Sequence, residues 1–501
     1  MLKVVLVDLF NKGTFGHRCL SSLLKQRGFT VYNVFGYSHL QYGQILTEKQ
    51  VLSLTSLISK LKPDLVGFSM ASILAHGSYV KLAQSIKKTN TLPIIAGGPY
   101  PSISPEFLIK EPCIDYVCVG EGEGSFLEFC DALSAHKSLE AIPGILSKCS
   151  DSCLQRDPPQ DLDLLPAQDM TGKNTYYIKR SGKILPEDPF LHTDEYQTKC
   201  SRGCPYQCAY CCNKKIGNLY SRRCRYYRVR SVTPIIEEIK EYKKKNPKVK
   251  KVFFMDDTFP SSIPWLEEFS RQYREQVALP FRIWINPNSM TKEGVLLLKK
   301  AGLSLAMMGI QSALDATRKS VFCRVETRER ILDNDRFLSE NGIQKQYDFI
   351  IDHPWEDAHE LQGMFDLILE CKKPIYSINM HSLMLFPGTD LEERAVREGV
   401  IDRAANAEAM IRQPIAMSRR AQWVPGIPIG RSYDKERKYW ARVIYLSQWN
   451  NPLAWRCMEI LARPAFVAKV GFFLPFLAAA KFAQDGIRII RKLMTLPGIF
   501  V

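Results

Sequence analysis

The sequence predicts an α/β fold with two successive sheet-and-helix regions, followed by a helical C-terminal region. Short apolar runs recur along the first 400 residues, and helix-like segments with charged outer faces separate them. Buried strands that alternate with helices favour parallel sheets. The length of 501 residues exceeds what one hydrophobic core usually organises, so we expect two to three domains.

Residues 1–140 are expected to form a doubly wound, Rossmann-like parallel sheet. Apolar runs predict strands over residues 4–7, 30–35, 65–69, 92–98 and 114–120, and a helix over residues 19–27 is expected to end at Gly28. Ligands of such sheets bind beyond the carboxyl ends of the strands. The small, polar and glycine residues that fall at those ends are Ser69, Met70, Ser72, Gly97, Gly98, Pro99, Gly120, Glu121 and Gly122.

Residues 141–190 have the composition of a linker. Asp157-Pro158-Pro159-Gln160-Asp161 and Leu164-Leu165-Pro166 interrupt any long helix or strand. We expect this stretch to wrap between two domains.

Residues 191–398 alternate between strand and helix patterns again. Strands are expected over residues 251–255, 281–285, 305–310, 347–351 and 375–379, and helices over residues 233–245 and 291–301. Thr233 followed by Pro234 is typical of a helix N-cap and first position. Repeated βα units of this length indicate a barrel or partial barrel whose loops after the strands carry the chemistry.

The loop Cys204-Pro-Tyr-Gln-Cys208-Ala-Tyr-Cys211 places three thiols at C-x3-C-x2-C spacing. Three thiolates can hold three corners of a cubane iron–sulfur cluster and leave one iron open to a substrate or cofactor. A structural zinc site and buried free thiols are the alternatives, but zinc fingers favour two separated ligand pairs. Cys200 and Cys212 flank the loop, and their roles stay open.

This spacing resembles the signature of the radical S-adenosylmethionine (radical SAM) superfamily, which has a partial (β/α)6 barrel fold. The resemblance implies that Cys204, Cys208 and Cys211 bind a catalytic 4Fe-4S cluster, and that S-adenosyl-L-methionine chelates the open iron and is cleaved to a 5′-deoxyadenosyl radical. It also implies contacts to S-adenosylmethionine from strand ends, although helix caps and ordinary polar loops are the alternatives. The expected residues are Tyr210, Asp256, Asp257, Asn286, Gly309, Gln311 and Ser312.

Two later residues, Asp348 and His353, are candidates for substrate contact or proton transfer, with a structural role as the alternative for the histidine. The turn at residues 386–389 resembles the one that closes the barrel in this family.

The first region resembles the cobalamin-binding domain that precedes many radical SAM barrels. The likeness lies in residues 66–69, 96–99, 104–106 and 114–123, and it implies that the strand-end residues named above bind cobalamin. The D-x-H-x-x-G pattern that supplies a histidine to cobalt is absent, so no such ligand is expected. A Rossmann-like domain that binds no cofactor is the alternative.

Residues 399–501 carry much of the charge excess, since sixteen basic and six acidic residues follow from Asp402 onward. The apolar run at residues 466–480 is short for a membrane span and is interrupted by Lys469 and Pro475. An interfacial amphipathic segment at an acidic membrane surface fits its basic flanks. A helical cap on the barrel and a dimer interface are equal alternatives.

The chain is expected in the reducing cytoplasm, or peripherally at the inner face of the membrane. Its start reads as a strand rather than a signal peptide, and its fifteen cysteines do not form a small disulfide scaffold. The net charge of +16 implies an anionic partner.

The most consistent function is that of a cobalamin-dependent radical SAM enzyme that methylates an unactivated carbon. We expect a hydrophobic, lipid-like or isoprenoid-like, or a natural-product substrate, and an electron donor such as flavodoxin or ferredoxin. Cyclisation, rearrangement and tRNA methylthiolation are the enzymatic alternatives, although the N-terminal cysteines lack the extra cluster loop of methylthiotransferases. A non-catalytic iron–sulfur protein that binds nucleic acid or acts as a scaffold is a further alternative; binding of nucleic acid is disfavoured.

Overall fold

A computed structural model describes residues 1–9, 15–36, 45–150, 152–412, 440 and 444. The amphipathic segment expected over residues 466–480 lies outside these residues. Two compact units divide the chain. Of the described residues, the first unit holds those within 1–283, 300–303 and 385–412, and the second holds those within 284–299 and 304–384 together with Trp440 and Ile444.

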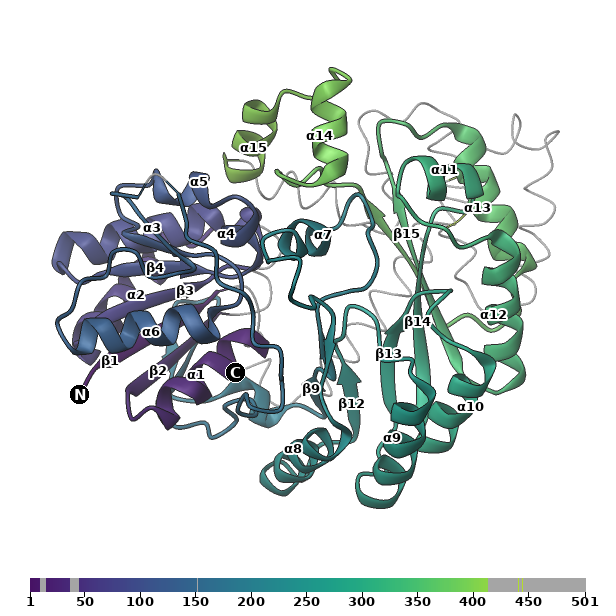
Figure 1. Cartoon of the computed structure of the whole chain (residues 1–501), viewed down its shortest axis with the longest axis horizontal. Coiled ribbons are helices and arrows are strands. Elements are labelled where there is room, and N and C mark those ends of the chain that lie inside the picture. Colours follow the sequence, from purple (N-terminus) through teal and green to yellow (C-terminus); the bar gives the residue numbers. More distant parts are fainter. Residues whose placement is uncertain (10–14, 37–44, 151, 413–439, 441–443, 445–501) are drawn as a thin grey trace. The chain divides into compact units, whose positions relative to one another are not determined.

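The first unit contains an eight-stranded sheet with the order β6-β5-β4-β3-β1-β2-β7-β8 (Figure 1). The pairs from β5 through β7 are parallel, and the two edge strands β6 and β8 are antiparallel. The expected doubly wound sheet is thereby confirmed. Its strands are β1 (Lys3–Asp8), β2 (Thr30–Gly36), β3 (Leu65–Ser69), β4 (Ile94–Gly97), β5 (Tyr116–Cys118), β6 (Ile145–Ser147), β7 (Thr175–Ile178) and β8 (Ile184–Leu185).

Helices cover both faces of this sheet. Helix α1 (Phe15–Gln26) packs against α6 (Gly122–Ser134), and α2 (Glu48–Leu61) packs against α3 (His76–Thr89). The face under α1 and α6 holds an apolar core that includes Leu6, Ile95 and Phe126. The short helices of this region are η2 (Ile73–Ala75), α4 (Pro99–Ile103) and α5 (Pro105–Ile109).

The stretch expected to be a linker contains more structure than its composition indicates. Strands β6, β7 and β8 within it extend both edges of the first sheet, and η3 (Pro189–His192) follows them. Each of these strands has two to four residues, which is too short for alternation to be visible in the sequence.

A second, six-stranded sheet has the order β16-β15-β14-β13-β12-β9. The pairs β9–β12, β12–β13, β14–β15 and β15–β16 are all parallel, as a partial (β/α)6 barrel requires. Strand β13 has the predicted bounds. The strands are β9 (Glu195–Thr198), β12 (Lys251–Phe254), β13 (Phe281–Ile285), β14 (Leu303–Gln311), β15 (Gln344–Ile351) and β16 (Ser377–Ser382).

Helices alternate with these strands, and a separate hairpin pairs β10 (Ser201–Arg202) with β11 (Arg228–Val229). One cap prediction is wrong: helix α8 begins after Ser231, so Thr233 lies in its first turn rather than at its N-cap. The helices are α7 (Cys212–Gly217), α8 (Val232–Lys245), α9 (Ile263–Gln276), α10 (Lys292–Ala301), α11 (Asp315–Ser320), α12 (Arg328–Glu340), α13 (Ala358–Glu370), α14 (Asp390–Arg397) and α15 (Arg403–Arg412).

Candidate functional site

The cysteine loop belongs to a hairpin that leaves the second sheet directly after β9. Its neck is the antiparallel pair β10–β11, in which Arg202 lies opposite Arg228. Gly203 opens the loop with φ of +77°, and a Cβ there would lie 2.3 Å from the carbonyl oxygen of Tyr226. Only glycine fits such a position without moving the backbone. The hairpin, residues 201–229, therefore holds the cysteine loop against its own returning strand.

The Cys204 thiol interacts electrostatically with the thiols of Cys208 and Cys211, the other two cysteines of the C-x3-C-x2-C motif. None of them forms a disulfide; Cys208 is buried, and Cys204 and Cys211 are partly buried. Burial raises the pKa of the Cys204 thiol to about 12. Bound iron reverses this effect, because a coordinating thiol is deprotonated outright. Three soft sulfur donors on one loop fit a 4Fe-4S cluster.

The two flanking cysteines differ from each other. Cys212 begins α7, and its contact with the Cys211 thiol raises the pKa of Cys211 and lowers the pKa of Cys212. Cys200 is fully buried behind the loop, and burial raises its pKa well above the ordinary value. Among the described residues, no group of three or more His, Cys, Asp and Glu side chains is placed to hold a single metal ion.

Two acidic residues follow β12 and have different surroundings. Asp256 is buried, and its carboxylate accepts hydrogen bonds from the backbone N–H groups of Cys200 (3.0 Å) and Ser201 (2.6 Å). Burial raises the pKa of Asp256 to about 6. Asp257 is exposed, and its carboxylate lies 4.0 Å from the Lys199 ammonium. Asp256 therefore supports the start of the hairpin, whereas Asp257 is open to a ligand.

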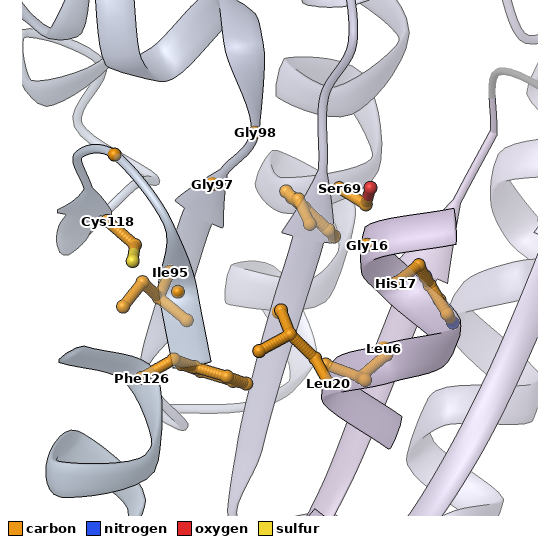
Figure 2. Close-up of a pocket in the computed structure, with 14 residues that line it drawn as sticks. Leu6, Gly16, His17, Leu20, Ser69, Ile95, Gly97, Gly98, Cys118 and Phe126 are labelled. Atoms are coloured by element: carbon orange, nitrogen blue, oxygen red, sulfur yellow. The ribbon is translucent and has the colours of Figure 1, made fainter. Parts of the chain in front are cut away.

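A cavity of about 110 Å³ lies in the first sheet under α1 and α6 (Figure 2). Its walls are mostly apolar, with Leu6, Leu20 and Phe126 at one end and the strand-end residues at the other. The fold of this cradle depends on Gly98, whose φ is +116° and whose added Cβ would lie 2.7 Å from the Met70 carbonyl oxygen. The predicted cobalamin-binding residues that line it are Ser69, Gly97, Gly98, Gly120 and Gly122.

A second cavity of about 310 Å³ lies in the same unit. It shares Gly16 and Ser69 with the first cavity, and Pro99 also lines it. Its lining also includes Lys199, which follows β9 of the second sheet, and Gly203, which precedes the first motif cysteine. The strand ends of both sheets therefore border one space, which suits a flat cofactor that reaches from one site to the other.

Three predicted cobalamin-binding residues have other contacts. The Met70 backbone hydrogen-bonds the neighbouring strand end, because its N–H donates to the Gly97 carbonyl and its carbonyl accepts from the Tyr100 N–H. Ser72 caps η2 by accepting from the Leu74 N–H. Glu121 pairs with Arg202 and Arg228. The predicted role of these residues in cobalamin binding stays a prediction.

Four predicted S-adenosylmethionine contacts lie in the second unit. Asn286 is buried, and its side-chain oxygen accepts from the Asn288 N–H. Strand β14 has a register shift between Gly309 and Gln311, and Gln311 has φ of +70°. An added Cβ at Gly309 would lie 2.6 Å from the Gln311 side-chain nitrogen, so that amide lies directly over the glycine. Ser312 is buried and donates to Glu360.

Asp348 and His353, the candidate substrate residues, are both buried in the second unit. Asp348 accepts hydrogen bonds from Asn379 (2.8 Å) and Gln346 (3.2 Å), and burial raises its pKa to about 6. The His353 ring packs near Phe322 and lies 3.3 Å from Glu360. The Asp348 carboxyl group thus accepts hydrogen bonds from two amides and has a pKa raised toward neutrality. The surroundings of His353 suit a structural role.

Two family models match this chain, one over each of the two sheet-and-helix regions. The radical SAM superfamily model matches residues 198–368, and the B12 binding domain model matches residues 4–129. This chain therefore joins a B12 binding domain to a radical SAM domain. The predicted fold class, enzymatic nature and cofactors (4Fe-4S cluster, S-adenosylmethionine and cobalamin) are thereby confirmed.

Several named methyltransferases are similar in sequence to this radical SAM enzyme. An uncharacterized methyltransferase of Pyrococcus horikoshii is 25% identical over 70% of this chain and 72% of its own. The cytidylyl-2-hydroxyethylphosphonate methyltransferase of Streptomyces wedmorensis is 24% identical over 72% and 71%. The hopanoid C-3 methylase of Methylococcus capsulatus is 24% identical over 69% of this chain and 64% of its own.

Two solved structures share the fold. The radical SAM methyltransferase TsrM from Kitasatospora setae, with cobalamin and a [4Fe-4S] cluster bound, has a TM-score of 0.61 at 17% identity, over 79% of this chain and 78% of that chain. The cobalamin-dependent radical enzyme OxsB has a TM-score of 0.60 at 14% identity, over 99% of this chain and 81% of that chain.

In the part of the chain that the structure describes, no helix is long and apolar enough to cross a membrane.

Proposed function

We propose that this enzyme methylates an unactivated carbon atom of a hydrophobic small molecule. The observation that carries the proposal is the 310 Å³ cavity, which is bordered by Ser69 and Pro99 of the cobalamin domain and by Gly203 beside the cysteine loop. When bound, the cofactors supply a 5′-deoxyadenosyl radical and a transferable methyl group. The protein supplies their placement.

The chain's own residues have separable parts in this proposal. Cys204, Cys208 and Cys211 would hold the cluster, and the exposed Asp257 would accept the ammonium group of S-adenosylmethionine in a charge-assisted hydrogen bond. The family resemblance implies a further contact to S-adenosylmethionine from Tyr210, beside the motif cysteines. It implies the same for Asn286, Gly309, Gln311 and Ser312 of the second unit. Asp348, buried in the second unit, would serve as a proton donor or acceptor, because its raised pKa lies near neutrality.

A lipid-like or isoprenoid-like substrate is the most consistent class. The hopanoid C-3 methylase of Methylococcus capsulatus and a hopanoid C-2 methylase of Rhodopseudomonas palustris are among the similar proteins. Cyclisation is the second candidate, because 156 residues are 29% identical to an anaerobic magnesium-protoporphyrin IX monomethyl ester cyclase of Synechocystis.

Anaerobic reconstitution with iron, sulfide and cobalamin tests the proposal. We expect about one cobalt and about four irons per chain, and transfer of a deuterated methyl group from S-adenosylmethionine to a molecule in a lipid extract. A product that loses hydrogen without gaining the label would favour cyclisation. Iron without cobalt would overturn the methyltransferase proposal.

The hairpin also offers a surface for the electron donor that reductive cleavage requires. Arg222, Arg223 and Arg225 are exposed on the turn between α7 and β11, and among the described residues none of them has an ion-pair partner. The same hairpin carries the three motif cysteines. We propose that an acidic one-electron carrier, flavodoxin or ferredoxin, docks on this turn, because complementary charge accelerates encounter.

Charge reversal of the three arginines should slow reduction by flavodoxin about tenfold or more at low salt. Cleavage of S-adenosylmethionine with dithionite should stay at the wild-type rate, because dithionite needs no docking surface. The matched control reverses Lys243, Lys244 and Lys245, which are exposed on α8. Equal slowing by both triple variants would contradict docking at the turn.

Peripheral association with a membrane rests on the sequence alone. We propose that the basic apolar tail brings the enzyme to a lipid substrate. The full chain should then sediment with anionic liposomes, and a chain lacking residues 464–501 should not. Unchanged sedimentation of the shortened chain would overturn this proposal.

A further inference from the structure

Four charged side chains meet at the neck of the cysteine hairpin. Arg202 donates to Glu121 at 2.9 Å and pairs with Glu123 at 2.6 Å. Arg228 donates through both terminal nitrogens to the same Glu121 carboxylate. All four side chains are at least 85% buried. We call this set the Glu–Arg latch.

The position of the latch in the fold indicates what it does. Its two arginines face each other across the β10–β11 pair, where the hairpin leaves the second sheet and returns. Its two glutamates follow β5 of the first sheet, and they alternate with Gly120 and Gly122, which line the cobalamin-domain cavity. The latch thus ties the loop that carries the cluster thiols to the loop that borders the cobalamin cavity.

A neutral hydrogen bond fastens the same two loops. The Glu121 N–H donates to the Tyr220 hydroxyl at 3.0 Å, and Tyr220 belongs to the hairpin. Within the cobalamin domain, the Gly120 N–H donates to the Ser102 hydroxyl of α4 at 2.9 Å, which holds the glutamate-bearing loop in place. Buried charges are costly unless they are paired and hydrogen-bonded, and here each glutamate faces at least one guanidinium.

We propose that Glu121 and Glu123 are positioning residues that hold the cluster hairpin at a fixed place beside the cobalamin-binding loop. This inference rests on the proposed function, because a methyl transfer that uses both cofactors requires a constant distance between them. It replaces direct cobalamin binding as the role of Glu121. The geometry favours the replacement, since Glu121 lines neither the 110 Å³ nor the 310 Å³ cavity and guanidinium groups occupy its carboxylate.

Hydrogen exchange on the full chain, with and without cofactors, tests the latch directly. In the Glu121→Gln/Glu123→Gln variant we expect amides of residues 201–229 to exchange about tenfold faster, because the neck loses its charge-assisted bonds. Arg228→Lys keeps the charge but loses the bidentate contact with Glu121, so its hairpin amides should exchange at an intermediate rate. Asp335→Asn, which breaks the buried Lys345–Asp335 pair in the second unit, is the matched control and should leave the hairpin unchanged.

The reconstituted enzyme provides a second readout. The spin–spin interaction between cob(II)alamin and the reduced cluster should be single-valued in the wild type and spread over a range in the double variant, with cobalamin affinity unchanged. A loss of cobalamin affinity with wild-type exchange in residues 201–229 would overturn the proposal in favour of direct binding. Wild-type exchange and a wild-type spin interaction would also overturn it.

Failure of the proposed function would look different. A wild-type chain that binds no cobalt would refute the methyltransferase proposal, while the exchange experiment without cofactors would still decide whether the glutamates hold the hairpin. If the double variant does not fold, Glu121→Gln alone serves, because Glu123 still pairs with Arg202.

Discussion

The two cofactor regions of the first unit both lie at strand ends, yet they are built from different types of residue. The cobalamin-domain cavity has apolar walls and glycines, and it offers a ligand space rather than charge. The cysteine hairpin offers thiols and arginines, and the exposed carboxylate of Asp257 follows β12. The first region is therefore suited to a ligand of matching shape, and the second to a ligand that needs sulfur donors.

This difference determines how each region responds to mutation. A cavity made by missing side chains tolerates loss of atoms and is damaged by added ones. A set of metal ligands tolerates small changes of shape nearby and is destroyed by loss of one donor. Substitutions that add or remove atoms in each region therefore separate the two modes of binding.

Loss of one thiol should have the largest effect. Cys204→Ala should reduce cluster content and S-adenosylmethionine cleavage to background, because two thiolates do not hold the cubane. Cobalamin binding should stay unchanged. Iron analysis and 5′-deoxyadenosine quantification check this outcome. Cys212→Ala is the matched control beside the motif, and equal loss in that variant would show that the motif assignment is incomplete.

Glycine replacement should damage each region selectively. Gly203→Ala and Gly98→Ala both place a Cβ on a left-handed backbone against a carbonyl oxygen, at 2.3 Å and 2.7 Å. Each should cost about 1–3 kcal/mol locally. We expect the first variant to lose cluster and keep cobalamin, and the second to do the reverse. Parallel loss of both cofactors from either variant would contradict the comparison.

Side chains of increasing size at Gly97 should test the comparison of the two regions further. An added Cβ at Gly97 meets Cys118 only at 3.4 Å, so the backbone accepts it while the cavity shrinks. Cobalamin affinity should fall about tenfold for Gly97→Ala and about a hundredfold for Gly97→Leu, since overpacking costs about 1–3 kcal/mol. Titration monitored by visible absorption measures both. Equal affinities would show that the ligand does not occupy this cavity.

The sequence was most informative where chemistry is local. The cysteine spacing and the strand Phe281–Ile285 could be predicted because neighbouring residues carry the signal. The edge strands β6, β7 and β8 could not, because two to four residues show no periodicity. The latch was also missed, since Glu121 is 81 residues from Arg202 and 107 residues from Arg228. Only the folded chain brings such charges together.

The smallest effect on cofactor binding should come from Asp348, a buried carboxylate that belongs to neither region. Its pKa is raised from 3.8 to about 6 by burial, so the folded chain binds this proton more tightly than the unfolded chain does. Its contribution to stability therefore falls as pH rises from about 4 to about 6. Asp348→Asn removes this loss, and the variant should gain about 3 kcal/mol relative to wild type between pH 4 and pH 7. Urea unfolding at several pH values measures the difference, and a pH-independent difference would show that Asp348 is ionised throughout and acts as a fixed charge rather than a proton store.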